Sequence, residues 1–355
     1  MTGTVTSFGY GGVSLQQTLN LTSLSQKKDG LQAQASTGVL SDSYAGLGNS
    51  RAQALALQPA ITQISAWSGN ITTVQNRLTT TQSVLNQIST IASDLNETLS
   101  TLAGSMSSST IGTVAQQAKT ALTSLGNLLN TQQGDSYIFS GLESSEAPVS
   151  GDPGNSDLAS SISQAVNQLG TADASSVLSS TLALAGNTAE NQPFSASLST
   201  DPTTASVQNL QIVTGKNETA TAGIVATQGS ASSGSSTGSP IRDLMRNLMV
   251  VAGLGSVDSG GANYTQLIQG LQDTNTAAID GLSDMSGVLG VQQNSLTTQS
   301  AMLEQMKSAL TTQLGTTKDA DLAQVSVQIN DTNNQLQASY SIIADMKGMT
   351  LASYL

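Results

Sequence analysis

The residues from Leu57 to Leu102 carry two apolar tracks, and this stretch constrains the fold more than any other. Each track repeats about every 7 residues and the two are offset by about 3, which is the a/d pattern of a coiled coil. The first track is Leu57, Ile64, Ile71, Leu78, Leu85, Ala92 and Leu99. The second is Ala60, Trp67, Val74, Thr81, Ile88, Leu95 and Leu102. A helix of this length measures roughly 70 Å and needs a partner to cover its apolar face.

A second heptad stretch, towards the other end of the chain, supplies that partner. Its main track is Leu282, Leu289, Leu296, Leu303 and Leu310. A partly polar companion track is Met285, Gln292, Gln299, Met306 and Gln313. Because aromatic residues are only 3% and charged residues 10% of the chain, a thin helical bundle suits the composition better than a wide globular core. We predict a mainly α fold, a long antiparallel coiled-coil bundle from both termini, with a smaller α/β or β-rich module inserted between them.

The chain divides into five parts on this reading. We expect an N-terminal assembly helix in residues 1–48, a long helical rod and hairpin in 49–150, and a variable surface module in 151–240. A returning helical rod follows in 241–317, and a C-terminal assembly helix in 318–355. Turn residues at 36–50 and a break at Gly315–Asp319 separate the terminal helices from the rods.

Shorter elements are predicted between the rods. A helix over Val114–Leu129 folds back on the first rod, and Tyr137–Phe139 forms one arm of a hairpin. Inside the module we expect helices over 158–169 and 177–185, a Ser/Gly linker over 229–239 and a helix over 240–252. Strands are expected over 194–198, 207–213 and 223–227.

Composition also excludes several classes of function. The net charge of −12 argues against nucleic acid as a partner. The chain has no Cys and no His, so it lacks the common thiol nucleophile, general base and metal ligands. We therefore predict no catalytic residue, no cofactor site and no metal site. No run of about 18 apolar residues is present, which argues against membrane insertion, and no cleaved signal peptide is recognisable.

The two terminal helices, over Ser14–Ala35 and Leu322–Met346, have only each other to pack on within the chain. A pair of helices is marginally stable alone, so we expect these helices to be ordered by contacts with other copies. The apolar tail at the C-terminus needs cover in the same way. The predicted assembly interface is Leu15, Leu19, Leu24, Leu31, Leu322, Ile329, Leu336, Ile343, Met346, Met349, Leu351, Tyr354 and Leu355.

Several motifs resemble the flagellin superfamily. Leu31–Gly38 (LQAQASTG) is similar to the turn after the first helix of that family, and Gly134–Gly141 (GDSYIFSG) is similar to its YIFxG segment. Leu336–Tyr340 (LQASY), Met349–Leu351 and the final Tyr354–Leu355 resemble the hook-filament junction branch, hook-associated protein 3. The resemblance covers about residues 14–150 and 240–355.

The resemblance implies a structural subunit of the bacterial flagellum, exported without a cleaved signal peptide and therefore extracellular. It implies self-assembly in a helical array, with other hook-associated proteins, flagellin and a flagellar export chaperone as partners. A filament flagellin is the nearest alternative. A coiled-coil signalling hairpin is a more distant one, and an enzyme the third; the zinc protease inserted in some flagellins needs His-Glu-x-x-His, which a chain without His cannot supply.

Overall fold

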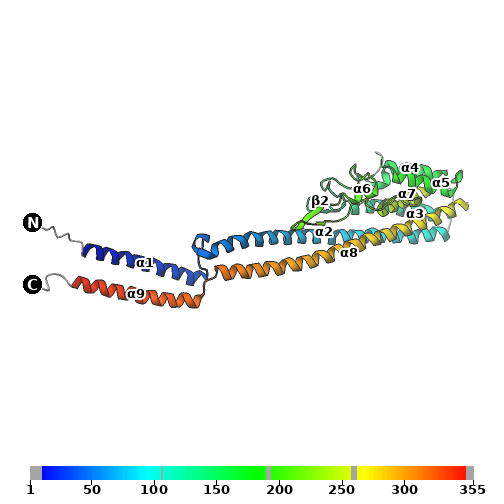
Figure 1. Cartoon of the computed structure of the whole chain (residues 1–355). Helices are drawn as coiled ribbons and strands as arrows, with labels where there is room; N and C mark the ends of the chain where they lie inside the picture. Colours follow the sequence, from blue (N-terminus) through cyan, green and yellow to red (C-terminus); the bar gives the residue numbers. More distant parts are fainter. Residues whose placement is uncertain (1–9, 105–106, 189–192, 257–261, 349–355) are drawn as a thin grey trace, which may run out of the picture. The chain divides into compact units, whose positions relative to one another are not determined.

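The computed structural model describes residues 10–104, 107–188, 193–256 and 262–348, and they form a mainly helical protein with long helices from both termini (Figure 1). This confirms the predicted fold class. Contacts divide the chain into two compact units. The terminal unit comprises Met1–Ser65 with Glu304–Leu355, and the central unit comprises Ala66–Leu303. Helices α2 (Arg51–Gly104) and α8 (Ala262–Lys318) contribute residues to both units.

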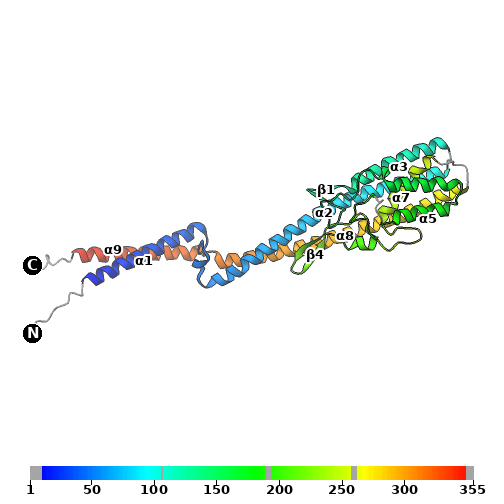
Figure 2. The ribbon, with the colours of Figure 1, turned by 90° about the horizontal axis from the view of Figure 1, so that it is seen from above.

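The terminal unit is built on two helices that lie side by side in opposite directions, α1 (Tyr10–Thr37) and α9 (Leu322–Gly348), as Figures 1 and 2 both show. Helix α1 ends as predicted, because Gly38 follows it in the left-handed conformation (φ +74°), which favours glycine. The chain then forms a short 3₁₀ helix, η1 (Tyr44–Ser50), before α2 begins.

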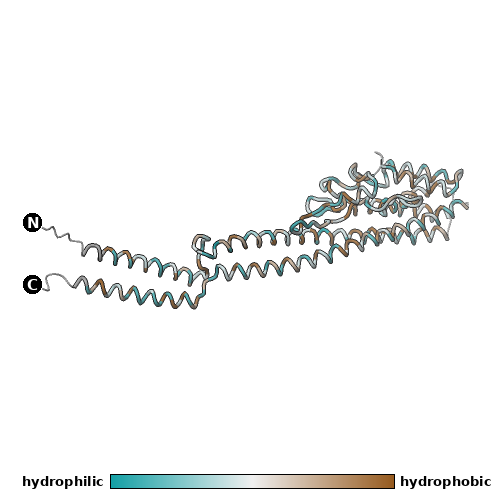
Figure 3. The backbone as a smooth tube through the Cα atoms, viewed as in Figure 1, coloured by the Kyte–Doolittle hydropathy of each residue, from teal (hydrophilic) through white to brown (hydrophobic). Residues whose placement is uncertain are grey.

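Helix α2 runs unbroken through the predicted heptads, with Pro59 and Gly69 inside it. Its buried side chains follow the two tracks closely, and Ile71, Leu78, Leu85, Ile88 and Leu99 are fully buried. On α8, Leu282, Leu289, Leu296 and Leu303 are buried in the same way. Hydrophobic and hydrophilic colours alternate along both helices in Figure 3, as expected when one face of each helix is buried.

Polar side chains fix the antiparallel register of α2 and α8 in the central unit. Gln75 Nε2 donates to Thr297 Oγ1 (3.3 Å), Gln82 Nε2 donates to Ser286 Oγ, and Asn275 Nδ2 donates to the carbonyl of Ala92 (2.8 Å). Partner positions on α8 fall as those on α2 rise, so the helices run in opposite directions. The pairing of the two predicted rods is therefore confirmed.

The predicted break at Gly315–Asp319 begins later than expected, because α8 continues to Lys318. A glycine inside a helix costs only about 1 kcal/mol relative to alanine, so Gly315 alone does not end α8. The turn lies at 319–321 instead. Asp321 Oδ1 accepts hydrogen bonds from the backbone N–H groups of Ala323 (3.0 Å) and Gln324 (3.2 Å) and so caps α9.

Helix α3 (Ser108–Leu129) follows α2 and is capped by Ser107, whose side chain accepts from the N–H of Thr110. It runs antiparallel to α2, as predicted, and packs on α7 (Pro240–Gly253), which lies beside it in Figure 2. A hairpin of β1 (Gln132–Gln133) and β2 (Ser136–Tyr137) comes next. The predicted hairpin arm at Tyr137 is therefore present, although shorter than expected.

The middle of the chain is more helical than predicted. Helices α4 (Asp157–Val166) and α5 (Ala174–Gly186) match the two expected helices and pack on α7. Also present are the 3₁₀ turns η2 (Pro153–Asn155), η3 (Asn167–Gly170) and η4 (Leu254–Ser256), and the short helix α6 (Pro202–Ser206).

Among the three predicted strands, only the end of 207–213 is extended, within the antiparallel pair β3 (Gln211–Gly215) and β4 (Glu218–Thr221). Phe194 forms a single bridge with Val149. Residues 223–227 are buried but form no strand, since they comprise a bend at Gly223, irregular backbone and a turn at 226–227. Burial produced their apolar composition, and composition alone does not separate a buried turn from a strand.

The predicted Ser/Gly linker over 229–239 is wrong at its C-terminal end. Thr237 and Ser239 are buried, and the carboxylate of Asp243 on α7 accepts hydrogen bonds from Ser236 Oγ and from the backbone N–H of Thr237 (2.8 Å). Ser239 caps α7. These contacts order the segment that leads into α7. Almost all residues of α7 are buried.

Candidate assembly interface

The facing sides of α1 and α9 form a seam within the chain. Leu31 on α1 is buried, and so are Val325, Thr332 and Leu336 on α9. The hydroxyl of Thr332 donates a hydrogen bond to the carbonyl of Gln328 in the preceding turn of the helix. Three further residues of the predicted interface are half-buried along the same seam: Leu24, Ile329 and Ile343. These positions hold the two terminal helices to each other.

Other predicted interface residues point away from that seam. Leu15 and Leu19 are 62% and 59% exposed, and Leu322 is 51% exposed. Leu15 and Leu19 are four residues apart on the face of α1 opposite Leu31, since each residue turns the helix by about 100°. The structure therefore separates the predicted residues into an inner seam and an outer apolar surface.

Three exposed apolar side chains of α9 were not in the predicted interface, namely Val327, Tyr340 and Ile342. They stand outside the heptad tracks, so a search for heptads passes over them. They can be recognised in the sequence as apolar residues at helical positions outside the buried seam. The side chain of Met346, and Met349, Leu351, Tyr354 and Leu355 as a whole, lie outside the described residues.

The turn after α1 closes on the turn before α9. The N–H of Leu40 donates to the carbonyl of Lys318 (2.7 Å), and the N–H of Ala320 donates to the carbonyl of Gly38 (2.9 Å). The ammonium group of Lys318 stands 5.4 Å from the ring centre of Tyr44, a cation–π contact. The LQAQASTG motif thus belongs to a clamp that joins the ends of α1 and α9.

The GDSYIFSG motif is structural as well. Arg77 of α2 donates from Nη2 to the carbonyl of Tyr137 (2.7 Å), and burial lowers the pKa of Arg77. Phe139 is fully buried, and its carbonyl accepts from the N–H of Ala226 (2.9 Å). Gly141 has φ +65°, and a Cβ there would lie 2.6 Å from the carbonyl oxygen of Gln208, so only glycine fits.

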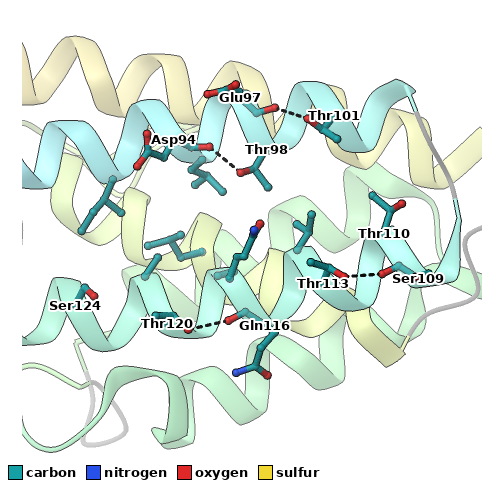
Figure 4. A pocket seen from close by; sticks show the side chains of 17 residues that line it. Asp94, Glu97, Thr98, Thr101, Ser109, Thr110, Thr113, Gln116, Thr120 and Ser124 are labelled. Atoms are coloured by element: carbon teal, nitrogen blue, oxygen red, sulfur yellow. Dashed lines mark hydrogen bonds between the residues drawn. The ribbon is translucent and has the colours of Figure 1, made fainter.

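A groove of about 1150 Å³ separates α2 from α3, and Figure 4 shows its two walls. Asp94 and Glu97 lie on the α2 wall, and the rest of the labelled lining is Ser, Thr and Gln. Hydroxyls on both walls donate to their own helices: Thr98 to the carbonyl of Asp94 (2.7 Å), Thr120 to that of Gln116 (3.1 Å). The groove therefore presents no activated nucleophile. Among the described residues, no group of three or more His, Cys, Asp and Glu could hold a metal ion.

The titratable side chains of this chain predict that the stability of the folded state changes little with pH near neutrality. The free energy of unfolding should change by less than about 0.5 kcal/mol between pH 6 and 9, since the chain has no His and no Cys. Urea titrations across this range measure it, and a change above about 1 kcal/mol would contradict it.

The clear pKa shifts among described groups lie outside that range. Burial lowers the pKa of both Arg242 and Arg246 to about 10 and raises that of Tyr264. Hydrogen bonds from Thr203 and from Ser176 lower the pKa of Asp201 and Asp173 respectively. Because these two carboxyl pKa values are depressed, their stabilising contribution is present above the unfolded-state pKa and is lost as the pH falls through the folded-state pKa.

The terminal helices α1 and α9 pair with each other and carry an outer apolar surface. This arrangement is typical of a structural subunit that packs against further copies. Two family models match the sequence: the bacterial flagellin N-terminal helical region over residues 11–144, and the bacterial flagellin C-terminal helical region over residues 273–355. Together they span more than half of the chain. The chain therefore belongs to the flagellin family and is a structural subunit of the bacterial flagellum that self-assembles through its terminal helices.

No curated protein matches the chain. The residues between the two family matches contain α4, α5, α6, the β3–β4 pair and α7. Among the described residues, no helix is both long and apolar enough to cross a lipid bilayer.

Proposed function

We propose that this subunit joins the hook of the flagellum to its filament. The observation that carries the proposal is the sequence of the C-terminal helix and tail. Leu336–Tyr340 (LQASY), Met349–Leu351 and the final Tyr354–Leu355 resemble the hook-filament junction branch of the family. In this role the chain contacts other hook-associated proteins on one side and flagellin on the other.

The outer apolar surface of the terminal helices supports assembly through Leu15, Leu19 and Leu322. Each leucine contributes about 1.5–3 kcal/mol when it moves from water into a packed contact. A head-to-tail contact between unlike surfaces does not close on itself and so generates a helical array. Leu31 and Leu336 keep α1 and α9 together, so that each subunit presents this surface as one unit.

Before export, such a chain needs cover for its apolar C-terminal residues, and we include a flagellar export chaperone among its partners. The predicted interface residues Met349, Leu351, Tyr354 and Leu355 form an apolar tail of the kind that an escort protein shields from water.

A filament flagellin is the second candidate. The observation in its favour is that both family matches are to the helical regions of bacterial flagellin, without reference to the junction. The mechanism of assembly is the same, and the difference lies in the number of copies and in their position.

Immunogold electron microscopy on whole cells separates the two. An antibody against residues 151–240 suits the experiment, since Ala231–Ser235 in this module is exposed. We expect label confined to a short band where hook meets filament. Label along the whole filament would make the chain a filament flagellin, and label in the cell body with none on the flagellum would contradict both.

A further inference from the structure

One polar side chain interrupts the apolar seam of α8. Asn275 lies one heptad before Leu282 in the main track of that helix, and its side chain is fully buried. Its Nδ2 donates to the carbonyl of Ala92 on α2 (2.8 Å), while its Oδ1 has no hydrogen-bond partner. A leucine at this position would bury no unpaired polar atom, so stability alone does not explain the asparagine.

Helix α2 has an equally unusual residue opposite Asn275. Its first track, from Leu57 to Leu99, consists of leucine and isoleucine except at Ala92. Because the side chain of Ala92 is a single methyl group, the amide of Asn275 can reach the backbone carbonyl beside it. The one polar member of the α8 track over 268–310 therefore meets the one small member of the α2 track.

Leucine heptads by themselves do not fix how two helices align along their length. When α8 slides along α2 by one heptad, each leucine takes the place of the next one. After such a slip Asn275 would lie against Leu85 or Leu99, where a larger side chain replaces the methyl group of Ala92. The buried amide would then lose its acceptor, and leaving a buried donor unpaired is costly.

The two other polar contacts between α2 and α8 are less selective. The hydrogen bond from Gln75 to Thr297 is exposed, and the one from Gln82 to Ser286 is only partly buried, so water can replace either partner. Gln293 lies one heptad after Ser286 and offers Gln82 another acceptor after a slip. Only the contact of Asn275 is both buried and restricted to one alignment.

We propose that Asn275 determines the register of the rod, that is, the alignment of α8 along α2. A single polar residue in an apolar helical seam specifies alignment at a cost in stability. Asn275 and Ala92 are 183 residues apart, so the alignment is chosen between helices that are remote in the sequence. A helical array requires every subunit to present the same surfaces, and a one-heptad slip displaces one helix by about 10 Å. The inference does not depend on whether the subunit belongs to the junction or to the filament.

Distances between two spin labels measure this register, because the chain has no Cys and two introduced thiols are unique. Ser93→Cys on α2 and Thr298→Cys on α8, both at exposed positions, are introduced into the full chain and labelled. Thr298 follows Thr297, the partner of Gln75, so the two labels are well separated along the helices. The chain is refolded from urea and frozen, and pulsed electron paramagnetic resonance gives the distances between the labels.

We expect a single distance with Asn275 present, and a second distance displaced by about 10 Å in both Asn275→Leu and Asn275→Ala. The ratio of slipped to aligned chains should rise at least about tenfold, which corresponds to about 1.4 kcal/mol of lost preference. Asn275→Leu should keep its urea midpoint at or above that of the natural chain, since it no longer buries an unpaired amide oxygen. It also fills the space at this position, so the test does not depend on the cavity that Asn275→Ala leaves.

Two control variants separate register from stability. Thr276→Leu adds the same side chain at the exposed neighbouring position, and Leu282→Ala weakens the seam while it keeps Asn275. Both should give the single distance. One unshifted distance in both Asn275 variants would overturn the proposal. A second distance in Leu282→Ala would overturn it as well, because loss of stability would then be enough to cause slippage.

Discussion

A chain in which Leu15 and Leu19 are both replaced by Asp should fold normally and fail to enter the flagellum. Both side chains are more than half exposed in the isolated chain, so their replacement removes little packing within it. If the proposed assembly surface is correct, each leucine contributes about 1.5–3 kcal/mol there, and a buried carboxylate without a partner costs several kcal/mol more. Since 1.4 kcal/mol is a factor of ten, we expect at least a 100-fold loss of incorporation.

Quantitative blotting of isolated flagella against whole cells measures this loss. Circular dichroism and urea unfolding of the purified chain should match the natural protein, which shows that the fold is intact. Val207→Asp is the control, because Val207 is 80% exposed and lies outside the terminal helices. Normal incorporation of the double Asp variant would remove α1 from the assembly surface and leave the exposed residues of α9 as the alternative.

Much of the fold could be predicted because heptads determine both the helix and its buried face. Leu78 and Leu85 on α2, and Leu282 and Leu289 on α8, are buried as their spacing predicts. Gly38 could be recognised as the end of α1 because only glycine adopts its conformation at low cost. Short strands were less predictable, since a two-residue strand such as β2 depends on contacts with residues outside it. Arg77, which contacts the carbonyl of Tyr137, lies far away in sequence, and Ser144 lies beyond the end of the strand.

The candidate interface was only partly predictable, for a physical reason. Periodicity indicates that Leu15, Leu24 and Leu31 lie on a helix that has an apolar face. It does not distinguish packing against another helix of the same chain from packing against a second copy. The structure resolves this for Leu31, which packs in the seam with α9, and leaves Leu15 outside that seam.

The buried arginines of α7 were not recognised in the sequence, where Arg242 and Arg246 look like one charged face of an amphipathic helix. Both are almost completely buried. Arg242 donates from Nη2 to the carbonyls of Leu198 (2.6 Å) and Thr200 (2.8 Å), and its guanidinium lies 5.7 Å from the ring centre of Phe194. The sequence does contain an indication of this burial: Leu244–Val251 is apolar on nearly all sides of the helix. A helix of that kind is usually buried all round.

Replacing Arg246 by Ala should destabilise the middle module by about 3–5 kcal/mol. The guanidinium donates to Thr181 Oγ1 (3.2 and 3.1 Å), to the carbonyl of Leu178 (3.0 Å), to Asn247 Oδ1 (2.8 Å) and to Thr274 Oγ1 (3.3 Å). It thereby ties α5 and α8 to α7. Alanine removes these hydrogen bonds and leaves a cavity next to polar groups that have lost a partner.

Arg246→Met separates the lost hydrogen bonds from the lost volume. Methionine fills most of the space and avoids the cost of burying a cation, a cost that is visible in the pKa of about 10 that burial gives Arg246. It still leaves the carbonyl of Leu178 and the Asn247 amide with fewer donors, so we expect a loss of about 1–3 kcal/mol. Urea unfolding measures the stability of both variants. Hydrogen exchange of the peptides from α5 and α7 then shows whether the loss lies in the middle module. Arg51→Ala, at an exposed arginine, should change stability by less than about 0.5 kcal/mol.

The order of the two losses tests how the middle module is held on the rods. If Arg246→Ala is much less stable than Arg246→Met, filling the space at position 246 dominates, and the polar contacts chiefly define orientation. If the two variants are equally unstable, the hydrogen bonds to Leu178 and Thr181 carry the docking of α5. A methionine variant as stable as the natural chain would show that the arginine is not required, and that α7 is held by its apolar neighbours such as Leu244 and Leu248, both fully or almost fully buried.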